Sequence, residues 1–124
     1  TPAHNTTLKT EHNSMMYEWS SQQKNLLLIT GHTHQPVFES LTHLERLQRR
    51  QTLSHAGNNE GYQASQIKPT YYNTGCCCFD DGDITGIEII EGDIKLVKWE
   101  WTNGEATRLE LESTTLEKLA NDLA

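Results

Sequence analysis

The stretch Leu26–Phe38, LLLITGHTHQPVF, decides the fold that this sequence predicts. Leu26–Thr30 is an almost continuous apolar run, which is typical of a strand buried on both faces. Gly31 follows, and glycine removes a side chain where the backbone must come close to another group. His32 and His34 then stand one residue apart, and in an extended segment they would point to the same side. We therefore expect two imidazoles to face one cavity at the C-terminal end of a strand, where α/β sheets bind their ligands.

Imidazole is the commonest ligand of transition metals in proteins, so His32 and His34 are the predicted metal ligands. Two imidazoles at this spacing can share one metal, or bind one metal each of a pair about 3.5–4 Å apart. The alternative is an H-x-H sequence on the surface that binds no metal, and the pattern alone leaves it open.

The chain as a whole predicts a mixed α/β fold with a largely antiparallel C-terminal sheet. Met15, Met16 and Trp19 have the three-to-four spacing of one apolar helix face, which we expect to pack in the core. The expected segments, in chain order, are a loop or frayed end over 1–13, a helix over 14–24, a strand over 26–30, a helix over 40–51, a loop over 52–70, a strand over 70–76, hairpin strands over 84–90 and 94–101 around a turn at 91–93, a third strand over 106–112 and a helix over 114–124.

Two of these helices have more specific sequence patterns. The helix over 40–51 places Leu41, Leu44 and Leu47 on one face. The helix over 114–124 begins with a candidate capping box, Thr114 with Glu117, in which each side chain would bond the other residue's backbone N–H.

Length and charge restrict the class of protein. The chain has 124 residues, enough for one small domain, and its net charge of −7 argues against nucleic-acid backbone as a partner. The acidic excess is uneven, because residues 1–75 hold six Lys or Arg and five Asp or Glu, whereas residues 76–124 hold four and twelve. No apolar run approaches the roughly 20 residues of a membrane helix, and the polar start shows no signal peptide. Since the first residue is Thr1, we expect the natural N-terminus to lie upstream.

The cysteines are consecutive, Cys76, Cys77 and Cys78. Neighbouring cysteines seldom have the geometry of a mutual disulfide, so we expect free thiols and a cytoplasmic location. A zinc site made by Cys and His is the alternative, although the C-x-x-C spacing of such sites is lacking.

The sequence GHTHQP at 31–36 resembles the last metal-binding motif, G-H-x-H, of the calcineurin-like metallophosphoesterases. Residues 71–99, YYNTGCCCFDDGDITGIEIIEGDIKLVKW, are similar to the C-terminal pattern of that family, in which a strand ending in Asn-x-Gly is followed by a hairpin with Asp and Gly at its tip. The resemblance covers roughly Leu26 to Trp101.

The resemblance implies a four-layer α/β/β/α sandwich of two mixed sheets flanked by helices, with two divalent metals (Mn, Fe, Zn or Ni) at one edge. His32 would bind the second metal and His34 the first, and Thr33 would fix the loop between them. Asn73 and Gly75 would shape the site. The metals would hold a bridging hydroxide that attacks the phosphorus of a phosphoester substrate, in line with the leaving group.

The family's other ligands come from D-x-H, G-D-x-x-D, G-N-H and a later isolated histidine, all upstream of G-H-x-H. The 30 residues before Gly31 match none of these motifs and contain no aspartate. GNNE at Gly57–Glu60 and the Gly-Asp pairs at 82–83 and 92–93 resemble parts of them, but each lacks the required histidine or aspartate, and we assign none to the site. The histidines expected to be solvated are His4, His12 and His43.

We therefore interpret residues 1–124 as the C-terminal portion of one metallophosphoesterase domain, inactive in isolation, with no membrane partner. The N-terminal portion would supply the other ligands. The alternative is a non-catalytic metal-binding or interaction module of this length. An upstream reading frame with D-x-H and G-N-H would favour the first interpretation, and a start codon just before Thr1 would favour the second.

Overall fold

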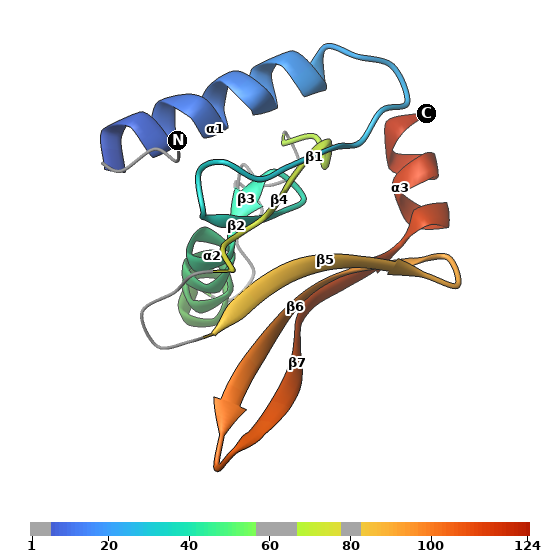
Figure 1. Ribbon diagram of the computed structural model, residues 1–124. Coiled ribbons are helices and arrows are strands. Elements are labelled where there is room, and N and C mark those ends of the chain that lie inside the picture. The colour runs from blue at the N-terminus through green and yellow to red at the C-terminus, as the bar shows by residue number, and fades with distance from the viewer. Residues whose placement is uncertain (1–5, 57–66, 78–82) are drawn as a thin grey trace.

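The protein has a mixed α/β fold, as predicted, built from three helices packed on two sheets in the part that the structure describes (Figure 1). The computed structural model describes residues 6–56, 67–77 and 83–124. Its helices are α1 (Thr6–Ser21), α2 (His43–Ala56) and α3 (Leu116–Leu123). Its strands are β1 (Leu28–Thr30), β2 (Pro36–Phe38), β3 (Leu41–Thr42), β4 (Tyr71–Thr74), β5 (Ile84–Ile90), β6 (Asp93–Thr102) and β7 (Glu105–Thr115).

The first sheet has the strand order β1-β4-β2-β3, and β1 and β4 are parallel whereas the other neighbours are antiparallel. Thr30 is paired with Asn73 in the parallel ladder, so the loops that follow β1 and β4 leave the sheet at the same edge. β1 is shorter than the predicted strand over 26–30. The prediction that this strand is buried on both faces is wrong, because Ile29 is 39% exposed. Within the described residues β1 is an edge strand, and one face of it lacks a cover.

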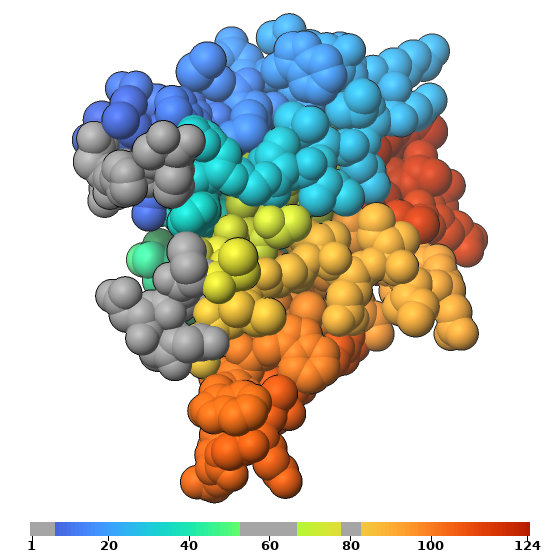
Figure 2. Space-filling view, viewed as in Figure 1, coloured from blue at the N-terminus to red at the C-terminus, as the bar shows by residue number. Residues whose placement is uncertain are grey.

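The second sheet is the antiparallel meander β5-β6-β7 that the sequence predicted. β5 spans the predicted residues, and Glu91 and Gly92 form the turn that leads into β6. β6 and β7 extend beyond β5, so the end of this ribbon projects from the body of the molecule (Figures 1 and 2). The alternation of apolar and polar residues along these strands identified them correctly because one face of the sheet is buried.

The core lies where the two sheets and α3 meet. Phe38 and Tyr72 come from the first sheet, Ile94 and Leu96 from β6, and Leu119 from α3; all are at most 1% exposed. The Phe38 and Tyr72 rings meet edge to face, with centroids 5.3 Å apart. Burial disfavours the phenolate anion, so the pKa of Tyr72 is raised far above its ordinary value.

Helix α1 differs from the prediction in its start and in its buried face. It begins at Thr6, within the region predicted as loop, and Met15 and Trp19 are 65% and 51% exposed instead of packed in the core. The buried residue is Ser20, whose hydroxyl lies 2.9 Å from that of Thr70. The inward face of α1 therefore carries polar groups such as Ser20, and Met15 and Trp19 lie on its outward face.

Helix α2, in contrast to α1, begins later than predicted. Leu41 belongs to β3, and the helix starts after Thr42, which forms a reciprocal capping box with Glu45. Leu44 and Leu47, predicted to be the packed face, are 64% and 41% exposed. The helix continues through residues 52–56, which the sequence predicted as loop.

The inward face of α2 is charged and meets Glu112 of β7, whose side chain is 6% exposed. Nδ1 of His43 and Nε of Arg46 each lie 3.1 Å from a carboxylate oxygen of Glu112, and Arg50 binds the same carboxylate. The prediction that His43 is simply solvated is therefore wrong. The spacing of the leucines predicted the helix correctly but placed its packed face on the wrong side, because ion pairs to Glu112 orient α2.

Helix α3 has its N-cap at Thr115, one residue after the predicted Thr114. The Thr115 side chain accepts a hydrogen bond from the backbone N–H of Lys118 at 3.0 Å. The predicted partnership of Thr114 with Glu117 is thus corrected by one position, because β7 continues through Thr115 and delays the helix.

Candidate functional site

The Gly31–His34 loop is not extended, which corrects the argument from i, i+2 spacing. His32 and His34 have φ values of 75° and 60°, in the left-handed region that non-glycine residues rarely adopt. The backbone N–H of Thr33 donates to the carbonyl of Gly31 at 2.9 Å, so the chain turns immediately after β1. Thr33 is fully buried and His32 is exposed. The residue between the histidines therefore anchors the loop.

The predicted role of Gly31 also needs correction. A Cβ at this position would meet Oγ1 of Thr74 at 3.7 Å, an ordinary van der Waals contact. Close approach occurs instead at Gly75, which has φ of +84° and where a Cβ would lie 2.9 Å from Cγ of Pro36 and also collide with the Thr85 hydroxyl. Gly75 is the glycine that the local geometry requires.

Asn73 joins the histidine loop to the end of β4. Its side chain is fully buried, and its Nδ2 donates to the carbonyl of Gly31 at 2.7 Å and to Oγ1 of Thr33 at 3.1 Å. Its Oδ1 accepts from the backbone N–H of Gly75 at 2.9 Å. The structure thus places the 73–75 turn beside the 31–34 loop. One buried amide fixes both segments because it satisfies backbone groups on each of them.

Helix α1 supplies contacts that sequence reasoning missed. Oδ1 of Asn13 accepts from the hydroxyl of Tyr71 at 2.7 Å and from that of Thr33 at 3.1 Å, and its Nδ2 donates to Oε1 of Gln35 at 2.8 Å. Nδ2 of Asn73 also lies 3.0 Å from the Tyr71 hydroxyl. Asn13, Thr33, Tyr71 and Asn73 therefore form one buried polar network, which couples α1 to the histidine loop.

His12 was predicted to be solvated, but it contacts His32. Nδ1 of His12 lies 2.8 Å from Nε2 of His32, and the two rings meet edge to edge with centroids 4.9 Å apart and planes inclined by 25°. A separation of 20 residues between the two histidines gave no local pattern from which this contact could be predicted. His4, the other histidine in this region, lies outside the described residues.

His34 lies beside Cys76, with Nδ1 and Sγ 3.5 Å apart. The chain after Gly75 is held by β5, because the carbonyl of Cys76 accepts from the N–H of Thr85 at 2.9 Å and its N–H donates to the Thr85 hydroxyl at 3.0 Å. Cys76 is buried and Cys77 is exposed, and neither forms a disulfide with a described residue, as predicted for these two cysteines. Cys78 lies outside the described residues.

Within residues 6–56, 67–77 and 83–124, no group of three or more His, Cys, Asp or Glu side chains gathers in a geometry that could hold a metal. The donor chemistry of His32 and His34 fits a transition metal, but two imidazoles do not complete a site. Further ligands would have to come from elsewhere. Among the sequences that resemble family motifs, Gly92-Asp93 belongs to the β5–β6 turn region and Gly57–Glu60 lies outside the described residues.

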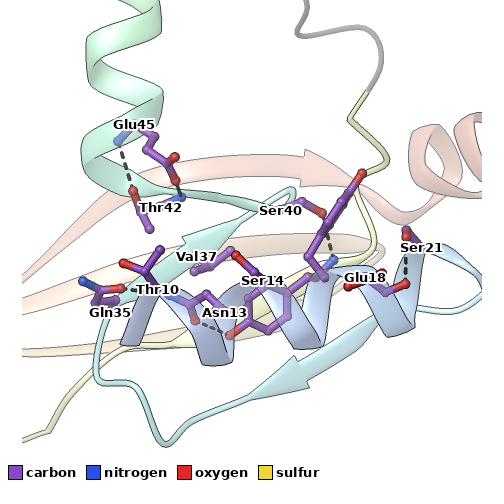
Figure 3. Close-up of a pocket in the computed structure, with 12 residues that line it drawn as sticks. Thr10, Asn13, Ser14, Glu18, Ser21, Gln35, Val37, Ser40, Thr42 and Glu45 are labelled. Atoms are coloured by element: carbon purple, nitrogen blue, oxygen red, sulfur yellow. Dashed lines mark hydrogen bonds between the residues drawn. The ribbon is translucent and has the colours of Figure 1, made fainter. Parts of the chain in front are cut away.

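A cavity of about 580 Å³ lies between α1 and the first sheet (Figure 3). Hydroxyl and amide side chains from α1, β2 and the β3–α2 junction line it, together with Glu18 and Glu45. Neither His32 nor His34 lines this cavity, but Asn13 and Gln35 do. The polar network of the histidine loop thus reaches one wall of the cavity.

No family model, curated protein or solved structure matches this chain. None of the helices that the structure describes is long and apolar enough to cross a membrane.

Proposed function

We propose that this chain is part of a metal-dependent phosphoesterase, to which it contributes His32 and His34 as two of the ligands of a dinuclear metal centre. The observation that supports the proposal most strongly is the bond from the Asn73 side chain to Gly31, 2.7 Å in length. It links the two segments that the resemblance pairs, the Gly-His-x-His loop and the Asn-x-Gly turn, at the edge where β1 and β4 both end. Ligand sites of α/β sheets lie at such edges.

The roles of the chain's own residues follow from their contacts. His32 and His34 each offer an imidazole nitrogen from a loop that cannot easily move, because Thr33 is buried between them and bonded to Asn13 and Asn73. Rigid placement of ligands favours metal binding because less conformational entropy is lost on binding. Two divalent metals, when bound, lower the pKa of a bound water and neutralise charge on the phosphoryl oxygens.

The remaining ligands, under this proposal, come from a second polypeptide segment that packs on surfaces exposed here. Ile29 of β1 and Ile89 and Ile90 of β5 are 39%, 52% and 57% exposed, and β1 and β5 are edge strands of their sheets. Exposed apolar edge strands pair readily with an added strand. A segment that pairs with β1 would also lie beside the histidine loop, which follows β1 directly.

The proposed substrate is a phosphoester, and the proposed location is the cytoplasm. Cys76 and Cys77 form no disulfide with a described residue, which fits a reducing compartment. The substrate class rests on the proposed metal chemistry, and the identity of the alcohol bound to phosphorus stays open.

The experiment is hydrolysis of an aryl phosphate with added Mn²⁺ by three proteins: the 124-residue chain, the longer chain encoded by the continuous reading frame, and the longer chain with His34→Ala. We expect little or no activity from the short chain, metal-dependent activity from the longer one, and a loss of orders of magnitude in the variant, since it lacks a metal ligand. The general acid and the bridging carboxylate that the mechanism needs are not among the assigned residues of the short chain.

Two results would contradict the proposal. Robust hydrolysis by the short chain that survives His34→Ala would exclude the proposed site. A longer chain that binds metal tightly but hydrolyses no phosphoester would favour the non-catalytic metal-binding module.

A further inference from the structure

The contact between α1 and the histidine loop assigns a function to His12. Nδ1 of His12 and Nε2 of His32 are 2.8 Å apart, which is the distance of a short hydrogen bond, so one of the two nitrogens holds the proton. The ring planes are inclined by only 25° at a centroid separation of 4.9 Å, so the rings meet edge to edge and the hydrogen bond lies close to both ring planes, which restricts rotation of the His32 side chain. Asn13, the next residue of α1, is bonded to Thr33, the next residue of the loop, so the backbone around the pair is held as well.

The direction of this hydrogen bond follows from histidine chemistry. A neutral imidazole carries its proton on one nitrogen and accepts on the other, and the tautomer protonated at Nε2 is intrinsically the more stable one. If Nε2 of His32 donates to Nδ1 of His12, both rings adopt that preferred tautomer. The opposite direction would require the less stable tautomer on both rings. Donation from His32 to His12 is therefore the favoured arrangement.

We infer that His12 is a positioning residue for His32, which it holds with a protonated Nε2 and with Nδ1 free to bind a metal. The role of His32 as a metal ligand rests on the proposed function. The hydrogen bond between His12 and His32 does not depend on it. A histidine that binds a metal usually donates its other ring N–H to a neighbouring acceptor, which fixes its tautomer and orientation. His12 is such an acceptor, supplied from a helix 20 residues earlier in the chain.

The direct test is NMR of the metal-free, ¹⁵N-labelled chain at a pH well above the ordinary histidine pKa of about 6.5. We expect a protected imidazole N–H proton assigned to Nε2 of His32, with a through-hydrogen-bond coupling to Nδ1 of His12. His12→Phe keeps an aromatic ring at this position but has no acceptor, so this proton should be lost to solvent exchange. His12→Asn places an amide oxygen near the former position of Nδ1, so the protected proton should return without the nitrogen–nitrogen coupling.

Two results of this test would overturn the inference. One is a protected proton that belongs to Nδ1 of His12. The other is a His32 signal that is unchanged by His12→Phe. The amide spectrum of β5–β7 serves as the control for folding, because these strands lie far from α1 in Figure 1.

Zinc titration then tests the positioning role separately. We expect His12→Phe to weaken Zn²⁺ binding about 10-fold and His12→Asn to restore it in part. Equal affinity in all three proteins would overturn the positioning role. If neither the 124-residue chain nor the longer chain binds Zn²⁺ while the protected proton is present, the proposed function fails and the hydrogen bond stands.

Discussion

The side-chain amide of Asn73 donates to the main-chain oxygen of Gly31 across 2.7 Å, and this bond ties the end of β4 to the loop that follows β1. Both residues precede a sharp turn, and the bond joins the loop, which Asn13 also holds, to the turn, which Thr85 also holds. The geometry of the candidate metal ligands His32 and His34 therefore depends on a residue about 40 positions away in the sequence.

Asn73→Ala is expected to lower the free energy of unfolding by about 2–3 kcal/mol, because it leaves the Gly31 carbonyl and the Thr33 hydroxyl without their buried donor. Urea denaturation measures the change. Asn121→Ala, at an exposed position of α3, is the control and should change stability by less than about 0.5 kcal/mol. If the two variants are equally stable, Asn73 does not hold the loop.

Gly75→Ala is expected to destabilise the protein by more than about 2 kcal/mol, since it combines a left-handed φ with collisions against Pro36 and Thr85. Gly92→Ala is the matched control, because Gly92 has almost the same φ of +83° and an added Cβ there would meet nothing within 4 Å. The control should lose about 1 kcal/mol from backbone strain alone. Thermal unfolding of both variants separates the cost of backbone strain from the cost of the collisions at Gly75. Similar losses of stability in the two variants would contradict the close packing around Gly75.

Glu112→Gln is expected to cost about 3 kcal/mol, because it leaves Arg46 and Arg50 beside a buried group that no longer carries charge. Glu110→Gln removes a carboxylate that is paired with Lys95 but 43% exposed, so water screens the pair and the loss should be much smaller. Denaturant titration of the two variants gives the comparison. A larger loss for Glu110→Gln would mean that α2 is not held through Glu112.

Acid should weaken the second sheet. Arg108 lowers the pKa of Glu88 and Lys95 lowers that of Glu110, in each case mainly through a side-chain hydrogen bond to the carboxylate. Because the folded-state pKa is below the ordinary 4.5, these pairs stabilise the folded state above pH 4.5 and cease to do so as the pH falls through the lowered values. The melting temperature of the wild type should therefore fall more on acidification from about pH 5 to about pH 2 than that of Glu88→Gln. If the melting temperatures of the wild type and Glu88→Gln fall by the same amount over this pH range, the Glu88–Arg108 pair does not contribute to the stability of the folded state.

The sequence predicted the second sheet well because its strands are amphipathic. Alternation over 84–90 and 94–101 marks residues that face a core, and Gly92 permits the turn between them with φ of +83°. Helix α1 was predicted poorly for a physical reason. Its inward face carries Asn13 and Ser20, which form hydrogen bonds to distant residues. Because these inward residues are polar, the spacing of apolar residues could not mark that face.

The histidine loop was located correctly from its sequence, but its conformation was not. The i, i+2 argument assumed an extended backbone, whereas the structure has left-handed φ at both histidines. The contacts of His32 with His12 and of His34 with Cys76 span 20 and 42 positions, and sequence spacing carries no information about such distances. The four-layer sandwich implied by the resemblance stays a prediction.

The most direct test of the central claim, that His32 and His34 are metal ligands, is paramagnetic broadening of the chain's NMR spectrum by substoichiometric Mn²⁺. Weak binding suffices, because Mn²⁺ broadens nearby resonances even when it exchanges rapidly. If His32 and His34 bind the metal, the resonances of Gly31–His34 and Asn73 should broaden first, and His34→Ala should greatly reduce this broadening. Broadening centred instead on the acidic strands β5–β7, and unchanged by His34→Ala, would contradict the central claim.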